Sequence, residues 1–425
     1  MKTFNSWGHF PPATPSRPHR VTSSDRLPEG VLLPRGLGRS YGDCCLNSGH
    51  TLLLTESLDE VMSLDTDSGI VRLGGGVSFD QLMRQCIPRG WFPPVVPGTK
   101  FITVGGAIAN DIHGKNHHLD GTFGCHVRRF ELLRSDGKRY QCSTTENPEL
   151  YAATIGGLGL TGLIVWAEIQ LRRVVATDMQ THIVKFANLQ EFLALSDEFK
   201  NSRYTVAWVD SQARGQELGR GHFMVGEHAD DGELQLHTER QWRSVPVFMP
   251  RFTLNRLSVR AFNCLYFHRQ RTSRRAHRQH FDSFFFPLDG IRNWNRIYGR
   301  RGFVQYQCVV DADAAGELLL RMAGVGPGSF LTVMKRMGPV TSPGLMSFPQ
   351  PGLTLCFDIP VRTRVLKSLD EIDNFVIDHG GRVYIAKDAR MSSAAFEAYY
   401  PQWRKFAESV DPAFCSDFWR RVTGG

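Results

Sequence analysis

The fold prediction rests on residues 97–114, which read Pro97-Gly-Thr-Lys-Phe-Ile-Thr-Val-Gly-Gly-Ala-Ile-Ala-Asn-Asp-Ile-His-Gly114. Gly105 and Gly106 lead directly into the small residues Ala107 and Ala109. A backbone that carries such small side chains can approach a flat or phosphorylated ligand closely. The stretch therefore predicts a ligand-binding loop.

Two further glycine-rich stretches flank this loop in the sequence. Residues 35–42, Arg-Gly-Leu-Gly-Arg-Ser-Tyr-Gly, could aim N–H groups at a phosphate, although a glycine-rich turn without a ligand explains them equally well. Residues 156–162 contain the spacing G-x-G-x-x-G, but they follow a helical stretch and precede a strand-like one. A dinucleotide-binding loop runs from strand to helix, so we reject a nicotinamide site there. Three loops of this kind indicate one extended cofactor held by several loops.

Length and composition exclude several classes of protein. A chain of 425 residues predicts two domains, and 41% hydrophobic with 22% charged residues excludes a disordered, collagenous or coiled-coil protein. No run of 18 apolar residues is present, and residues 1–20 lack the apolar core of a secretory signal. Nine cysteines without a C-x-x-C pair predict reduced thiols, and we expect a cytoplasmic protein.

Hydrophobic patterning predicts an α+β protein with two textures. Short apolar runs between turns predict strands at 31–33, 51–54, 70–73 and 163–171, with short helices at 79–89 and 146–154. Longer alternating runs then predict strands at 204–209 and 302–310, with helices near 188–199, 311–323, 366–379 and 392–422. We therefore expect a cofactor-binding domain at 1–176 and an antiparallel-sheet substrate domain at 177–381. Residues 382–425 are expected to return to the first domain.

The basic charge is concentrated in one segment. The chain has a net charge of +8, yet residues 240–281 contain ten arginines and no acidic residue, so the remainder is slightly acidic. Large apolar residues, among them Trp242, Phe252, Leu257 and Phe267, lie between these arginines. This pattern suits a membrane surface with anionic headgroups. A solvated loop is the alternative, and nucleic acid is disfavoured because no known binding motif accompanies the arginines.

The three glycine loops resemble the flavin-binding domain of the vanillyl-alcohol-oxidase/p-cresol-methylhydroxylase superfamily. Residues 111–118, 294–299, 303–307 and 384–388 sharpen the resemblance to one subfamily, which oxidises polyprenyl-phosphoryl ribose. The similarity extends from Trp7-Gly8 to Cys415-Ser-Asp. It implies a two-domain α+β fold with FAD between the loops, and an antiparallel-sheet substrate domain.

The resemblance also implies the contacts of FAD. Many members of the superfamily tether the flavin through a histidine before the serine of the first loop, where this chain has Arg39 before Ser40. We therefore expect noncovalent FAD. The implied cofactor contacts are Arg35, Gly36, Leu37, Gly38, Arg39, Ser40, Tyr41, Pro97, Gly98, Thr99, Thr103, Val104, Gly105, Gly106, Ala109, Asn110, Ile112, His113, Gly114, Asn116, Gly159, Gly162, Ile164 and Tyr384.

Oxidation of a sugar hydroxyl also needs a proton acceptor. Lys387 is the candidate, in a strand-like run 382–388 where it alternates with Ile385; a surface lysine paired with Asp388 is the alternative. His113 is implied as a substrate-pocket histidine, and a structural histidine is its alternative. The spacing of His113, His117 and His118 permits a metal only on a helix, so we expect none.

The resemblance implies further pocket residues. Tyr41 is implied beside Lys387 and His113 in the catalytic group. Phe285, Thr354 and Met337 depart from the expected Tyr, Asn and Phe, which puts fine substrate preference and the identity of the pentose in doubt. The implied substrate contacts are Gln307, Lys335, Cys356, Val333, Phe285 and Lys387.

The implied activity is FAD-dependent oxidation of the C2′ hydroxyl of a polyprenyl-phosphoryl-β-D-ribose to the 2′-keto sugar. A separate NAD(P)H-dependent short-chain reductase would complete an epimerisation to the arabinose donor of cell-wall glycans. An alditol or aldonolactone oxidase with a soluble substrate is one alternative, and a polyprenyl-phosphate-binding protein without flavin is another. We expect peripheral contact with the inner membrane through residues 240–281, on the cytoplasmic or the periplasmic face.

Overall fold

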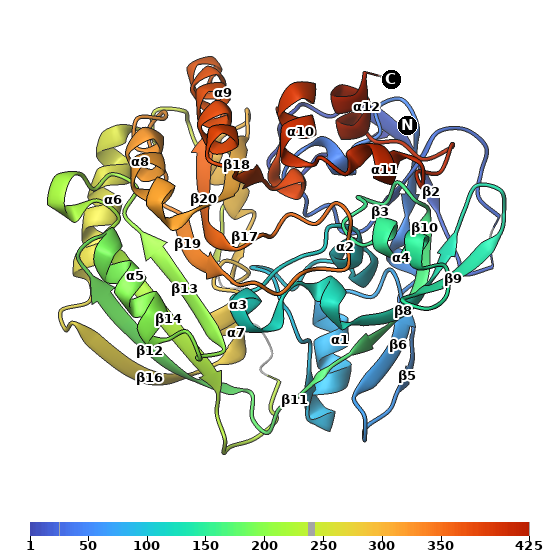
Figure 1. Cartoon of the computed structure of the whole chain (residues 1–425), viewed down its shortest axis with the longest axis horizontal. Helices are drawn as coiled ribbons and strands as arrows, with labels where there is room; N and C mark the ends of the chain where they lie inside the picture. The colour runs from blue at the N-terminus through green and yellow to red at the C-terminus, as the bar shows by residue number, and fades with distance from the viewer. Residues whose placement is uncertain (25, 237–242, 425) are drawn as a thin grey trace.

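The structure is a computed structural model, and it describes residues 1–24, 26–236 and 243–424. Figure 1 shows two halves side by side: the N-terminal third and the C-terminal helices form the right half, and the middle of the chain forms the left half. Both chain ends lie on the right half. Within the described residues no helix is long and apolar enough to cross a membrane.

The right half contains two sheets with short helices. A four-stranded sheet has the order β1 (Lys2–Thr3), β2 (Pro15–Arg20), β4 (Thr51–Leu54), β3 (Leu32–Arg35). An antiparallel sheet has the order β5 (Val61–Leu64), β6 (Ile70–Gly74), β10 (Leu163–Gln170), β8 (Val127–Leu133), β9 (Arg139–Ser143). The helices are α1 (Phe79–Cys86), α2 (Val104–Ala109), α3 (His117–Asp120) and α4 (Pro148–Thr154). Strands β7 (Trp91–Phe92) and β11 (Arg172–Arg173) pair separately.

The left half is built on one antiparallel sheet of eight strands. Their order is β16 (Arg274–His280), β12 (Asp178–Phe186), β14 (Gly221–His228), β13 (Tyr204–Val209), β19 (Thr332–Met337), β20 (Gly352–Pro360), β18 (Phe303–Val310), β21 (Arg382–Val383). The helices of this half are α5 (Leu189–Glu198), α6 (Arg256–His268), α7 (Phe281–Phe285), α8 (Ala312–Met322) and α9 (Thr363–Asp378). A short parallel pair joins β15 (Arg243–Ser244) to β17 (Ile291–Arg292).

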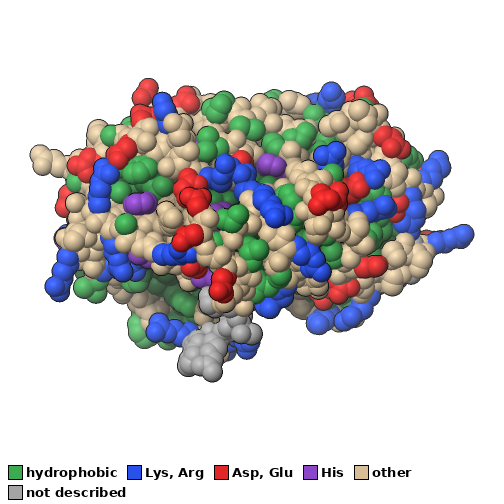
Figure 2. Space-filling model, turned by 90° about the horizontal axis from the view of Figure 1, so that it is seen from below, with side chains coloured by type: hydrophobic (Ala, Val, Ile, Leu, Met, Phe, Trp, Pro, Cys, Tyr) green, Lys and Arg blue, Asp and Glu red, His purple; other side chains and the backbone are tan. Residues whose placement is uncertain are grey.

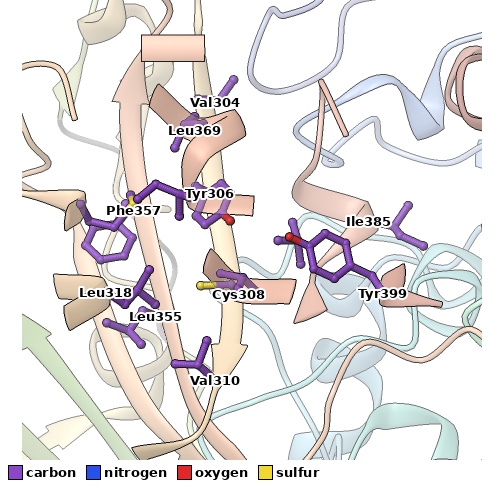
Figure 3. Close-up of a cluster of buried hydrophobic side chains, with 14 of the residues drawn as sticks. Val304, Tyr306, Cys308, Val310, Leu318, Leu355, Phe357, Leu369, Ile385 and Tyr399 are labelled. Atoms are coloured by element: carbon purple, nitrogen blue, oxygen red, sulfur yellow. The ribbon is translucent and has the colours of Figure 1, made fainter. Parts of the chain in front are cut away.

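Successive side chains of a strand point to opposite faces, and the central strands of this sheet use the two faces differently. On one face the residues are apolar and buried, and they pack against α8, α9 and the C-terminal segment; Figure 3 shows Val304, Tyr306, Cys308, Val310, Leu355 and Phe357 with Leu318, Leu369 and Tyr399. The opposite face of the same strands carries Gln305, Gln307, Thr354, Cys356 and Asp358. Burial of the first face therefore fixes which residues face the right half.

The C-terminal segment returns from the left half to the right half. After β21 it continues through a 3-10 helix, η7 (Ile385–Lys387), and helices α10 (Ser393–Tyr399), α11 (Trp403–Ala407) and α12 (Asp417–Thr423). The Tyr41 backbone N–H donates to the Ala386 carbonyl at 3.0 Å, and Arg421 pairs with Asp43 and Asp388 at 2.8 and 2.9 Å. These contacts attach the segment that carries Lys387 to the first glycine loop.

Most of the expected elements are confirmed. The strands expected at 51–54 and 204–209 have these bounds, and the helix expected at 366–379 begins slightly earlier, at Thr363. The α+β class with an antiparallel second sheet is confirmed as well. One expectation is wrong: residues 382–388 are not a single strand, because η7 begins at Ile385 and removes the alternation of Ile385 with Lys387. The boundaries at 176 and 381 stay predictions.

Gly42 tests the attachment of the C-terminal segment. A Cβ atom at this position would overlap the carbonyl oxygen of Asp388. Because this oxygen belongs to the backbone, it can move aside only if the chain itself shifts. We expect Gly42→Ala to lower the free energy of unfolding by about 3 kcal/mol and to weaken flavin retention. Gly290→Ala is the matched control, because no atom lies within 4 Å of its added Cβ. Equal thermal unfolding midpoints for the two variants would contradict this prediction.

Candidate active site

The three glycine loops lie against one another. The Leu158 and Gly156 backbone N–H groups donate to Ala109 and Ile108 at 2.7 and 2.9 Å, which joins the third loop to the second. A Cβ at Gly36 would clash with the hydroxyl of Thr103, so the first loop also packs on the second. The loops therefore form one continuous surface rather than three separate turns.

This surface has the features that an extended polar cofactor requires. The buried side-chain atoms Arg39 Nε and Asn110 Oδ1 have no hydrogen-bond partner in the described part of the chain. Such atoms are costly unless a ligand or water satisfies them. Gly98 has open space where a side chain would point. The residues thus fit FAD, which supplies a two-electron acceptor when it is bound.

Arg39 occupies the position at which many members of the superfamily have the histidine that tethers the flavin. Its guanidinium is 4.2 Å above the ring of Trp7 and 5.5 Å from that of Phe101. Burial lowers the pKa of Arg39, but an arginine offers no imidazole nitrogen for a bond to the flavin. Noncovalent attachment of FAD therefore stays a prediction that rests on Arg39.

The polar face of the large sheet presents residues in cross-strand rows. Gln307, Cys356, Val333 and Trp208 are directly opposite one another on neighbouring strands, so their side chains share one face. Lys335 is opposite Thr354 in the next row. Val333 is the most exposed of these side chains, with 36% of its surface accessible. The row leads from the glycine loops toward the far side of the left half.

His113 joins the second glycine loop to this face. Its Nδ1 is 2.7 Å from Lys335 Nζ, and its Nε2 is 3.0 Å from Gln307 Nε2. Lys335 Nζ also donates to the Gly114 carbonyl at 2.6 Å, and Gln307 Nε2 donates to Thr354 Oγ1 at 3.2 Å. All four contacts are satisfied when Lys335 is neutral and His113 donates to it from Nδ1. Both nitrogens of His113 are then occupied, so His113 positions neighbouring groups.

Three lysines surround this cluster, and their environments differ. Burial lowers the pKa of Lys335 to about 7, with a further contribution from Lys115, and burial lowers that of Lys115 to about 8. Lys115 donates to the Phe285 carbonyl at 3.1 Å. Lys387 Nζ lies 3.9 Å above the ring of Tyr41, and it has no hydrogen-bond partner among the described residues. Among these three lysines, Lys387 is thus the one whose amine is not engaged by a hydrogen bond in the described part of the chain.

The surroundings of Lys387 differ from those of a surface lysine. Burial lowers its pKa, an effect that Cys356 and Asp358 partly oppose. Asp388 does not pair with it, because the Asp388 carboxylate accepts from the Met391 N–H at 3.0 Å and pairs with Arg421. Lys387 therefore does not form the surface pair with Asp388.

Several predicted residues have structural contacts instead. The guanidinium of Arg35 donates to the carbonyls of Asn5 and Cys45, and the Asn116 amide donates to Pro94. Phe285 is fully buried, 4.9 Å from the ring of Tyr204, and lies behind Lys115. Met337 is buried in a small cluster with Phe348 and Tyr384. These positions remain predicted contacts.

The remaining predicted residues are distributed along the loops and the adjoining strand. Tyr384 stacks on Phe348 at 4.7 Å and donates to the Asn110 carbonyl at 2.8 Å. His117 accepts from the Gly338 N–H and His118 contacts the Ser202 carbonyl, so the three histidines point to different partners. The others lie within or beside the three loops: Leu37, Ser40, Pro97, Thr99, Val104, Gly105, Gly106, Ile112, Gly159, Gly162 and Ile164.

Sequence reasoning missed an acidic residue beside Lys387. Asp358 is buried on β20 and accepts a hydrogen bond from Gln305 at 2.5 Å. Burial raises its pKa to about 7, against the opposing effects of Gln305 and Lys387. The signal was present, because Asp358 is the one charged residue in the sequence 353–359. Burial also raises the pKa of Tyr41, and the charge of Asp358 adds to this effect.

Comparisons with known proteins agree with this arrangement. Residues 27–143 match the FAD binding domain family. The chain is 36% identical over 410 residues to decaprenylphosphoryl-beta-D-ribose oxidase of Mycolicibacterium smegmatis, covering 92% of this chain and 89% of that protein. It is 33% identical over 368 residues to an uncharacterized protein of Streptomyces coelicolor, covering 81% of this chain and all of that protein. Similarity to Delta(24)-sterol reductase of Rattus norvegicus, 32% over 115 residues, covers 27% of this chain and 22% of that protein.

The nature of the flavin attachment can be tested directly. Because Arg39 stands before Ser40, we expect acid precipitation of the holoenzyme to release all of its FAD into the supernatant. The measurement is the absorbance of the supernatant and of the redissolved pellet near the flavin maximum. Flavin absorbance that stays with the washed pellet would show a covalent bond at another residue.

Proposed function

Because the chain belongs to the decaprenylphosphoryl-β-D-ribose oxidase family, we propose that it oxidises the C2′ hydroxyl of a polyprenyl-phosphoryl-β-D-ribose. The chain is an FAD-dependent oxidoreductase of the vanillyl-alcohol-oxidase/p-cresol-methylhydroxylase type. The observation that carries the proposal is the free amine of Lys387, held over Tyr41 beside the polar face of the sheet. The product is the 2′-keto sugar, and bound FAD would supply the two-electron acceptor.

Each residue of the cluster has a distinct part in this proposal. Lys387 accepts the proton of the C2′ hydroxyl, because its amine is free and burial lowers its pKa. Lys335 and Gln307 orient the sugar hydroxyls from the sheet face, and His113 holds both of these side chains in place. Asp358 stabilises the ammonium that forms on Lys387. Tyr41 provides the aromatic surface under that ammonium.

The 2′-keto sugar suits a second enzyme. An NAD(P)H-dependent short-chain reductase that adds hydrogen to the opposite face of C2′ would give the arabino epimer. A soluble alditol or aldonolactone is the rival substrate for the same fold. The exposed apolar face described below favours the lipid-linked sugar, because a soluble substrate gives no reason for such a face.

Anaerobic mixing of the holoenzyme with polyprenyl-phosphoryl ribose tests the proposed reaction. We expect bleaching of the flavin by the wild-type protein, and full FAD content but reduction slower by about 10²- to 10⁴-fold in Lys387→Ala. The wild-type kcat/KM should rise with pH toward a plateau, because only the neutral amine accepts a proton, and the midpoint should lie below the ordinary lysine pKa.

Two results would contradict these assignments. Near-normal reduction of Lys387→Ala would remove Lys387 from the proton transfer. Rapid bleaching by an alditol, with none by the lipid-linked ribose, would favour the soluble-substrate oxidase.

We also propose that the protein docks on a membrane through residues 243–281. Six large apolar side chains of this segment are exposed; they are Val247, Met249, Phe252, Leu257, Phe262 and Leu265. Leu257 and Leu265 on α6 are 80% and 73% accessible. Exposed arginines accompany them. On the face shown in Figure 2, basic and acidic side chains are intermixed. Apolar side chains next to cations are typical of contact with anionic lipid.

The structure corrects the expectation that all ten arginines lack partners. Arg274 pairs with Glu198 at 2.9 Å, and Arg278 pairs with Asp178 and Asp231 at 2.8 and 2.9 Å. These acidic residues lie outside the segment in sequence, so the composition of the segment could not reveal them. Phe267 is also buried rather than lipid-facing, and Arg240 and Trp242 lie outside the described residues.

Vesicle binding tests the docking proposal. We expect Leu257→Ser/Leu265→Ser to weaken binding to anionic vesicles at least about tenfold, because inserting each leucine is worth about 1.5–3 kcal/mol. Met62→Ser is the control, since Met62 is 38% accessible on β5, in the other half of the molecule (Figure 1). Turnover of a short-chain, water-soluble substrate should be unchanged. Absence of wild-type vesicle binding at low salt would refute the docking proposal.

A further inference from the structure

A shallow surface depression lies beside the proposed docking face. Three arginines from separate parts of the chain line it: Arg251, Arg301 and Arg362. Arg251 and Arg301 are exposed, and Arg362 is half-buried at the end of β20. Only Arg251 belongs to the basic segment of the sequence, so the fold assembles this site.

The three arginines carry uncompensated charge. None of them forms an ion pair with an acidic side chain in the described part of the chain, in contrast to Arg274 and Arg278. Residues 290–310 add four arginines and, like residues 240–281, contain no Asp or Glu. Like-charged guanidinium groups around one depression repel one another unless an anion lies between them.

The walls of the depression are apolar and well fixed. Leu254 and Ile297 line it, and the ring of Tyr298 closes its inner side, stacked on Phe303 at 4.2 Å. Arg362 Nη2 donates to the Leu254 carbonyl at 2.8 Å, which uses one of its five N–H groups. The Met249 N–H donates to the Arg296 carbonyl at 3.0 Å, which holds the adjoining loop in place.

The depression adjoins two strongly exposed apolar residues. Phe252, 77% accessible, directly follows Arg251, and Val247 is 63% accessible on the same loop. The arginines next to exposed apolar side chains match the two parts of a membrane lipid, which has a phosphodiester at the surface and acyl chains beneath it. An arginine fork matches phosphate oxygens with bidentate hydrogen bonds.

We propose that Arg251, Arg301 and Arg362 form a binding site for the phosphodiester headgroup of an anionic membrane lipid. The proposal rests on the docking function proposed above and gives it a discrete anchor. Phe252 and its apolar neighbours enter the acyl region while the three guanidinium groups hold one headgroup phosphate. The site is separate from the catalytic cluster, because the buried ring of Tyr298 lies between the depression and Asp358.

Two double variants of the FAD-loaded, full-length protein test this site. Arg251→Ser/Arg301→Ser removes two exposed lining side chains, neither of which forms a hydrogen bond or an ion pair within the described residues. Arg260→Ser/Arg271→Ser removes the same charge from exposed positions of the same segment outside the depression. Inorganic phosphate is the soluble probe, measured by titration calorimetry, and phosphatidylglycerol and phosphatidylcholine vesicles are the lipid probes. Unfolding midpoints equal to wild type establish that both variants are folded.

We expect phosphate to bind the wild type and the Arg260/Arg271 variant equally, and to bind the Arg251/Arg301 variant about tenfold more weakly. Affinity for phosphatidylglycerol vesicles should fall further in the Arg251/Arg301 variant than in the Arg260/Arg271 variant. Phosphate binding that is absent from the wild type, or equal in all three proteins, would overturn the site while leaving docking through α6 intact. Phosphate binding with equal vesicle affinity of the two variants would assign the depression to a soluble anion and overturn the headgroup role.

Discussion

The alternation of side chains across β18 and β20 is the constraint on which the rest of the structure depends. Val304, Tyr306 and Leu355 must point into the apolar core beneath α8 and α9, which Figure 3 shows. Gln307 and Cys356 are then forced onto the opposite face. A slip of one residue in register would exchange the two faces, so hydrophobic burial also specifies the polar face of the proposed active site.

The second requirement is the return of the chain after β21. Lys387 does not belong to the large sheet; it is delivered by η7, whose neighbours bond to the first glycine loop and to α12. A free amine is thus held between two parts of the molecule that are built from distant segments. Burial between these parts keeps the amine desolvated, which lowers the pKa of Lys387.

The sequence predicted the elements better than their detailed contacts. The strand at 204–209 was placed correctly from its run of aromatic, β-branched and apolar residues, all of which are buried. The run 382–388 was misread as a strand, since a short 3-10 helix shares its apolar composition. The partners of Arg274 and the pairing of Gln305 with Asp358 could not be predicted, because both depend on residues far apart in sequence. The glycine loops indicated a cofactor, but only their mutual packing explains how they act together.

The central claim is that the cluster around Lys387 directs oxidation to C2′ of a lipid-linked ribose. The most direct measurement is the anaerobic rate of flavin reduction with substrate that carries deuterium at C2′, compared with substrate labelled at C3′. The account predicts a primary isotope effect for the C2′ label and none for the C3′ label, because only the C2′–H bond breaks in the reductive step. A primary effect confined to the C3′ label would contradict it. Equal rates with the unlabelled, the C2′-labelled and the C3′-labelled substrate would also contradict it, under conditions where flavin reduction limits the observed rate.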